Sequence, residues 1–122
     1  MNPEALPDLS EDTVRAILDD RLDDDTVNAL VWRSLGFVYD AAEERWDSSQ
    51  AIAPWTNDEE PPHFTGSRPA TVKLTRATPK KHKQLLKEQL NFSGYRVAEL
   101  TPRKTRRATA ANWLLHVLAD QS

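Results

Sequence analysis

The sequence lacks cysteine altogether and has only three glycines and one methionine among its 122 residues. Without cysteine there are no disulfides, thiolate zinc sites, iron–sulfur clusters or thiol nucleophiles. The three glycines are isolated, which excludes a glycine-rich phosphate loop. A long apolar run is also missing, because the most apolar stretch, residues 110–119, has about half the length of a membrane helix and contains Asn112 and His116. We therefore expect no membrane association.

The first twelve residues carry no targeting signal, because they are acidic and contain two prolines instead of a basic segment followed by an apolar one. We expect a cytoplasmic protein. Hydrophobic residues make up 39% of the chain, which is enough for one packed core. The predicted organisation is a flexible lead-in over residues 1–9 and a single domain over 10–122, with a long, proline-containing loop at 48–68.

The first half of the domain is predicted to hold two helices and two brief strands. Ser10 is a suitable N-cap for a helix over residues 11–22, and a second helical stripe ends at Leu35, before Gly36. These helices should form a hairpin. Residues 37–39 and 45–47 could then form a short β-hairpin around a polar turn.

The second half alternates between extended and helical signals. Residues 70–76 alternate apolar and polar side chains, as a strand does, and Thr78-Pro79 is typical of a helix start. Residues 95–100 fit a short strand or a single helical turn, and Thr101-Pro102 then opens a last helix that should end near residue 119. That helix is apolar on almost every side, so we expect it to be buried and central.

These elements predict an α+β fold: an N-terminal helical hairpin, a short β-hairpin, and then β-α-β-α with a central C-terminal helix. If residues 95–100 are helical, the alternative is a mostly helical protein whose C-terminal half is similar to a helix-turn-helix unit.

The net charge of −3 conceals a strong asymmetry between the halves of the chain. Residues 1–62 contain 16 acidic residues and four arginines, whereas residues 63–122 contain three acidic and 12 basic residues. Either the halves neutralise each other in the fold, or the asymmetry marks an interaction surface.

Positive charge gathers at the start of the last predicted helix, where it opposes the helix dipole. Each cation there costs roughly 0.3–1 kcal/mol, so an opposite charge is expected on this segment. We interpret the segment as an anion- or partner-binding site; its residues are Thr101, Arg103, Lys104, Thr105, Arg106 and Arg107. The opposite charge is either internal, from the aspartates of residues 19–25, or external, from a phosphate, a nucleic acid or an acidic protein.

Four further cations are candidates for the same surface: Lys80, Lys83, Lys87 and Arg96. They could follow a phosphate backbone, with Phe92, Tyr95 or Trp113 available for stacking. The alternative is an ordinary solvated helix face, which the sequence pI of about 5.6 favours over a nucleic-acid domain.

Nothing in the sequence predicts catalysis, a bound cofactor or a metal. No two of the histidines, His63, His82 and His116, have metal-ligand spacing, and we interpret His82 and His116 as half-buried helix residues. The acidic residues 19–25 lack the glycine and distal glutamate of a calcium loop, and no nucleophile motif is present. We therefore expect a protein that is not an enzyme.

Three segments resemble a family of small proteins of unknown function from cyanobacteria and plastids: GSRPATVKLTR (66–76), KQLLKEQL (83–90) and GYRVAELTPRKTRRATAANWLL (94–115). The resemblance implies a phototrophic context and no particular chemistry. LLKEQL, Gly94 and TPRKTRRAT are also similar to the small-subunit ribosomal protein S-eighteen family, in which such a segment opens an RNA-contacting helix, although Lys104 replaces its second arginine.

The sequence therefore predicts a non-catalytic accessory protein of a photosynthetic cell. Its basic helix start would dock onto an acidic protein surface or onto a second copy of the chain. The alternative is an RNA- or ribosome-associated factor that uses the same residues.

Overall fold

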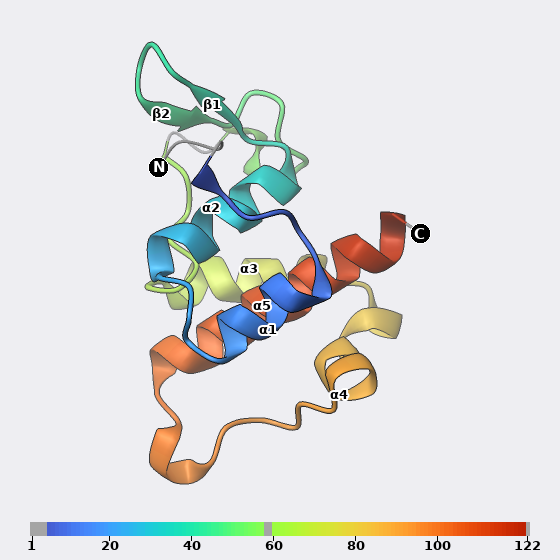
Figure 1. Ribbon diagram of the computed structural model, residues 1–122. Coiled ribbons are helices and arrows are strands. Elements are labelled where there is room, and N and C mark those ends of the chain that lie inside the picture. Colours follow the sequence, from blue (N-terminus) through green and yellow to red (C-terminus); the bar gives the residue numbers. More distant parts are fainter. Residues whose placement is uncertain (1–4, 58–59, 122) are drawn as a thin grey trace.

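The computed structural model describes residues 5–57 and 60–121 (Figure 1). Its elements are α1 (Glu11–Leu18), α2 (Asp24–Leu35), β1 (Val38–Asp40), β2 (Arg45–Asp47), α3 (Arg68–Ala77), α4 (Leu85–Leu90) and α5 (Pro102–Gln121), with 3-10 turns at Trp55–Asn57, Lys80–His82 and Val97–Glu99. One two-stranded sheet accompanies five α-helices in this part of the chain, an arrangement that fits the predicted α+β class.

Local capping signals set the ends of the first two helices. The Ser10 side chain accepts a hydrogen bond from the Thr13 backbone N–H, as predicted for an N-cap, and Asp23 does the same for Thr26 at the start of α2. Gly36 ends α2 with φ +96°, and a Cβ there would lie 2.8 Å from the Gln50 carbonyl oxygen. The position therefore requires glycine.

The first helix ends at Leu18 and not at residue 22 as predicted. Asp20 has a φ of +60°, in the left-handed region that short polar side chains tolerate, and this turns the chain out of the helix. Leu22 still packs against the core from the following loop, which explains why the apolar spacing looks helical up to that residue. The early end exposes the Asp20 carboxylate beside the last helix.

The predicted β-hairpin is confirmed. Its strands pair antiparallel, with Tyr39 opposite Trp46 and Val38 opposite Asp47. Trp46 is buried, with its ring 5.8 Å from that of Trp32 and 5.6 Å from that of Tyr39. These aromatic contacts attach the hairpin to α2.

The predicted strand at residues 70–76 is wrong, because these residues belong to α3. The Ser67 side chain caps the helix by accepting from the Ala70 N–H, and Pro69 lies in its first turn. The β-branched Thr71 and Thr75 fit the helix, since their hydroxyls donate to carbonyls one turn earlier. The alternation of apolar and polar residues in this segment therefore does not correspond to alternating buried and exposed side chains.

The helix predicted to start at Thr78-Pro79 is much shorter than expected. Thr78 ends α3, with both its backbone N–H and its hydroxyl donating to the Leu74 carbonyl, and no side chain that the structure describes caps the turn that follows Pro79. A 3-10 turn follows, and α4 begins only at Leu85.

Residues 95–100 contain no strand. The chain forms a single 3-10 turn at Val97–Glu99, close to the helical-turn alternative. The predicted β-α-β-α order is therefore wrong, and the C-terminal half is helical in the residues that the structure describes.

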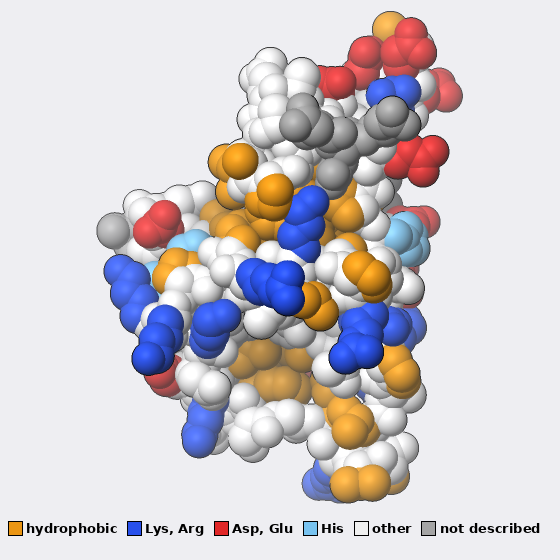
Figure 2. All heavy atoms as spheres, turned by 180° about the vertical axis from the view of Figure 1, so that it is seen from behind, with side chains coloured by type: hydrophobic (Ala, Val, Ile, Leu, Met, Phe, Trp, Pro, Cys, Tyr) orange, Lys and Arg blue, Asp and Glu red, His pale blue; other side chains and the backbone are white. Residues whose placement is uncertain are grey.

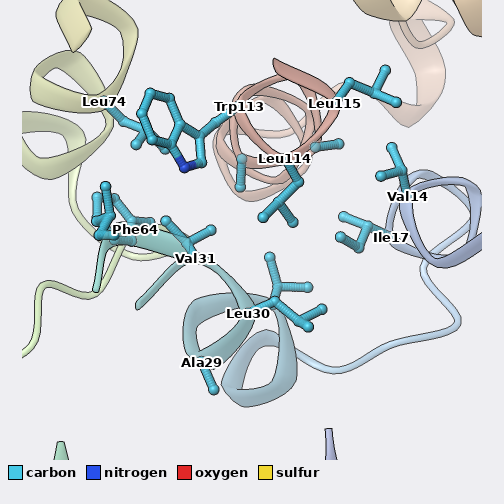
Figure 3. Close-up of a cluster of buried hydrophobic side chains, with 14 of the residues drawn as sticks. Val14, Ile17, Ala29, Leu30, Val31, Phe64, Leu74, Trp113, Leu114 and Leu115 are labelled. Atoms are coloured by element: carbon cyan, nitrogen blue, oxygen red, sulfur yellow. The ribbon is translucent and has the colours of Figure 1, made fainter. Parts of the chain in front are cut away.

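The last helix is central, as predicted. It packs against α1, α2, α3 and α4, so the two helices of the expected N-terminal hairpin each pack mainly against α5 (Figure 1). Leu114 points between Ile17 of α1 and Leu30 of α2, while Trp113 lies toward Leu74 of α3 (Figure 3). Buried apolar side chains from every helix thus form one core around α5.

The long loop and the lead-in also contact this core. Trp55 and Phe64 in the loop are fully buried, and Leu6 before α1 is buried too. The first four residues of the predicted lead-in lie outside the described residues, and its flexibility stays a prediction. None of the described helices is both long enough and apolar enough to cross a membrane.

Candidate functional site

The basic start of α5 begins with a side-chain cap. The Thr101 hydroxyl oxygen accepts from the Lys104 N–H at 3.1 Å, and the Thr105 hydroxyl donates to the Thr101 carbonyl at 3.1 Å. The threonine cap predicted from the Thr-Pro pair is confirmed. Both hydroxyls are therefore used, in part, within the helix itself.

Arg103 is held by two aspartates of the N-terminal half. Its Nη2 donates to Oδ1 of Asp20 at 2.9 Å and its Nη1 to Oδ2 of the same carboxylate at 3.2 Å, while its Nε donates to Oδ2 of Asp24 at 2.9 Å. This is a bidentate pair with an additional contact to a second carboxylate. The hydrogen bond from Arg103 lowers the pKa of Asp20 from its ordinary value.

Arg107 lies one turn further along α5 and is fully buried. Its Nη1 donates to Oδ1 of Asp24 at 2.8 Å, and its Nη2 donates to the carbonyls of Ile17 and Leu22. Burial raises the pKa of Asp24, but hydrogen bonds from Arg103 and Arg107 outweigh it, so the pKa lies below its ordinary value. The internal alternative therefore holds for these two arginines: they join the loop between α1 and α2 to the last helix.

The other two cations of the helix start have different surroundings. The Lys104 ammonium lies 5.4 Å from the centre of the Tyr95 ring, a cation–π distance. Arg106 lies on the opposite side of the helix from this contact and lines a hollow between α3 and α5 together with Arg68. Of the four cations, Arg106 thus remains available to the outer surface next to α3.

The hollow beside Arg106 is an apolar groove of about 460 Å³, in which Val72 faces Leu100 and Pro102. A second hollow of about 660 Å³ continues past Val72 to Ile52 and Pro54. We call the two together the basic apolar face; its exposed apolar side chains are Ile52, Val72 and Leu100, and its cations are Arg68, Lys73, Arg76 and Arg106. Among the residues that the structure describes, no aspartate or glutamate lines either hollow.

Figure 2 shows the molecule from behind, where basic and hydrophobic side chains are interspersed over its middle. Acidic side chains gather at the upper end of this view, where the β-hairpin lies. The charge asymmetry of the sequence is therefore neutralised only in part by Arg103 and Arg107. The remaining charges are separated in space, with acidic side chains at the end that holds the β-hairpin and basic side chains over the middle of this face.

The four additional cations do not form one surface. Lys83 and Lys87 line a polar cleft between α3, α4 and α5, whereas Lys80 is exposed and lines neither that cleft nor the groove. Arg96 is exposed on another side of the molecule, in a hollow that also contains Asp19 and Asp20. The four cations are thus divided among three separate parts of the surface.

Two contacts beside the site are not predicted by the sequence. The Nδ1 atoms of His82 and His116 lie 2.8 Å apart, and the Asn112 side chain accepts from the Leu86 N–H and donates to the His82 carbonyl. These contacts fasten the 3-10 turn and α4 onto α5. The signal in the sequence is the narrow polar face of the last helix, where Asn112 and His116 lie one turn apart among apolar residues.

The sequence profile of the family described as "Domain of unknown function (DUF1823)" matches residues 8–119. The chain belongs to this family. A solved structure, described as "Solution NMR structure of the protein", superimposes with a TM-score of 0.81 at 51% sequence identity, over 94% of this chain and 97% of that one. No curated protein matches the sequence significantly. Membership in the DUF1823 family assigns no chemistry to the chain.

Proposed function

We propose that this protein is a non-catalytic accessory protein that docks onto an acidic helical segment of a partner protein through the basic apolar face. One observation carries the proposal. Three of the five large hydrophobic side chains that are exposed among the described residues, namely Ile52, Val72 and Leu100, lie on this one face. Hydrophobic side chains gathered in a groove favour burial against another molecule.

The exposed fractions of these side chains are substantial: 50% for Ile52, 37% for Val72 and 54% for Leu100. Covering them would remove apolar surface from water at roughly 25 cal/mol per Å². Arg68 and Arg106 border the same groove, and arginine is enriched in protein interfaces. The geometry thus combines an apolar centre with a charged rim.

Charge complementarity defines the occupant. A groove with arginines at its rims, and with no carboxylate among the described residues that line it, favours a segment with carboxylates on its flanks and apolar side chains in its centre. The groove runs beside α3, whose ten residues span about 15 Å. An amphipathic helix of about three turns has that length and places apolar side chains on one face.

This proposal reassigns the docking residues within the basic helix start. Arg103 and Arg107 bind internal carboxylates and hold the fold together, so the docking charge comes from Arg106 and from Arg68 and Arg76 of α3. The photosynthetic and cytoplasmic setting belongs to the proposal as well. The support for the photosynthetic setting is the resemblance of residues 94–115 to a family from cyanobacteria and plastids.

Selection from a displayed library of helical peptides of about three turns, at low salt, tests the proposal directly. Enriched peptides should combine apolar residues at one-turn spacing with aspartate or glutamate beside them. Binding should fall about tenfold for Arg106→Glu, since a charged contact becomes repulsive. The matched control Arg45→Glu, on strand β2 outside the face, should bind as well as the unchanged protein.

Four results would contradict the proposal as stated. Enriched peptides without acidic residues would contradict the charge argument, and unchanged binding by Arg106→Glu would contradict the location. Retention of single-stranded RNA in place of peptides, with a steep salt dependence, would instead support the RNA-associated alternative. A concentration-dependent dimer that Arg106→Glu dissociates would show that the acidic segment belongs to a second copy.

A further inference from the structure

The polar cleft beside α4 is separate from the groove and shares only Thr75 with it. Its volume is about 420 Å³, within the range of small-molecule sites. The end of α3, helix α4, the turn at residues 92–94 and the middle of α5 form its walls. Four separate segments of the chain therefore meet around one hollow.

The charged residues that line this cleft are both lysines. Lys83 and Lys87 belong to its lining, and no aspartate or glutamate of residues 5–57 and 60–121 does. Lys83 Nζ donates to the Thr75 carbonyl at 2.8 Å, which fixes one ammonium group at the cleft and leaves it two further N–H donors. Two neighbouring cations without a lining carboxylate make the cleft attractive to an anion.

The uncharged lining is divided between polar and apolar groups. Gln84, Ser93 and Thr109 supply amide and hydroxyl groups, while Leu86, Phe92 and Ala108 supply apolar surface. The Thr109 hydroxyl donates to the Thr105 carbonyl, so toward the cleft it acts as an acceptor. A matching ligand has an anionic group at one end, hydroxyls, and a small carbon skeleton.

The walls of the cleft are fixed in place before any ligand binds. Asn112 of α5 bonds both to the Leu86 N–H and to the His82 carbonyl, at 3.2 Å and 2.9 Å. Leu85 and Leu90 of α4 are buried in the core. A site whose walls are held by hydrogen bonds and packing loses little freedom when it binds, which favours measurable affinity for a small molecule.

We propose that this cleft binds a small organic phosphate, with the phosphoryl group between Lys83 and Lys87 and the carbon skeleton against Leu86 and Phe92. A phosphate monoester carries a charge between about −1.5 and −2 at pH 7, so two ammonium groups neutralise it. A single carboxylate would leave one of the two lysines uncompensated. Lysine is also a common phosphate ligand that acts as a point charge.

The experiment is a titration with phenyl phosphate, monitored by the backbone amide signals in NMR at constant ionic strength. Signals of Leu86, Ser93 and Thr109 should shift and saturate. Benzoate, which has the same ring and a single charge, should bind about tenfold more weakly, and inorganic phosphate should also bind more weakly because it lacks the ring.

Variants locate the phosphoryl group. Lys87→Gln should weaken phenyl phosphate binding about tenfold, while the matched control Lys80→Gln, an exposed lysine outside the cleft, should leave it unchanged. Arg106→Glu should also leave it unchanged, so this inference can hold or fail independently of the proposed docking function. Equal binding of benzoate, equal loss in both lysine variants, or no saturable shift at millimolar concentrations would overturn it.

Discussion

Arg107 on α5 donates from Nη1 to Oδ1 of Asp24, the first residue of α2, over 2.8 Å, with none of the arginine side chain exposed. The same guanidinium also donates to two backbone carbonyls at the end of α1 and in the loop that follows. One buried cation thus connects the last helix to the end of α1, the loop after it and the start of α2, which lie 83 to 90 residues earlier in the chain. The contact explains why positive charge is tolerated where it opposes the dipole of α5.

Removing this cation should destabilise the fold. Arg107→Ala removes the Arg107 donor from Oδ1 of Asp24 and from two carbonyls and opens a cavity, so the free energy of unfolding should fall by about 3 kcal/mol. Chemical denaturation measures this change. Arg106→Ala, one position earlier, should change it by less than about 0.5 kcal/mol. Equal losses in the two variants would contradict the structural role of Arg107.

The aspartates around Arg103 should make stability depend on acid pH. The hydrogen bond from Arg103 lowers the pKa of Asp20 in the folded protein. The Asp20 carboxylate therefore contributes its full stabilisation above the pKa that it has in the unfolded chain, near 4. This stabilisation is lost as the pH falls through the lower pKa that Asp20 has in the folded protein. Denaturation midpoints between pH 7 and pH 2 should fall less steeply for Asp20→Asn than for the unchanged protein. Parallel pH profiles would show that this carboxylate is not coupled to folding.

The histidine pair should add a second pH dependence at higher pH. Burial lowers the pKa of His116, the neighbouring His82 and Lys81 lower it further, and Asp120 opposes them. Because His116 has a lower pKa in the folded protein than in the unfolded chain, its neutral ring stabilises the fold above the unfolded pKa of about 6.5. This stabilisation is lost as the pH falls through the pKa of the folded protein. NMR titration of the His116 ring should give a midpoint below 6.5. In denaturation, His116→Gln should lose less stability between pH 7.5 and 5.5 than the unchanged protein does, and an equal loss would contradict this account.

The sequence predicts those parts of the fold that local chemistry determines. Ser10 and Gly36 cap helices where expected, the β-hairpin has its predicted strands, and the apolar last helix is central. The sequence does contain start signals for helix α3, because Ser67 and Pro69 form a cap followed by a proline, as Thr101-Pro102 does at the last helix. The period-two alternation of residues 70–76 predicts a strand with one buried face, whereas in the structure these residues are helical and only Leu74 of the helix is buried.

The candidate site required information that no local pattern contains. The aspartates that bind Arg103 and Arg107 lie about 80 residues earlier in the chain, and the pattern alone left internal and external partners open. Ile52, Val72 and Leu100 come from a loop, a helix and a turn, so their common face exists only after folding. The contact between His82 and His116 arises in the same way, from the packing of α4 against α5.

A charge-swap measurement tests the docking claim most directly. The dissociation constant of an acidic helical peptide is measured against the unchanged protein and against Arg106→Glu, and then again with one peptide glutamate replaced by lysine. If the acidic segment docks beside Arg106, Arg106→Glu weakens binding of the acidic peptide about tenfold, and the lysine-containing peptide restores affinity for this variant alone. Equal affinities across all four combinations would show that the acidic segment does not bind beside Arg106.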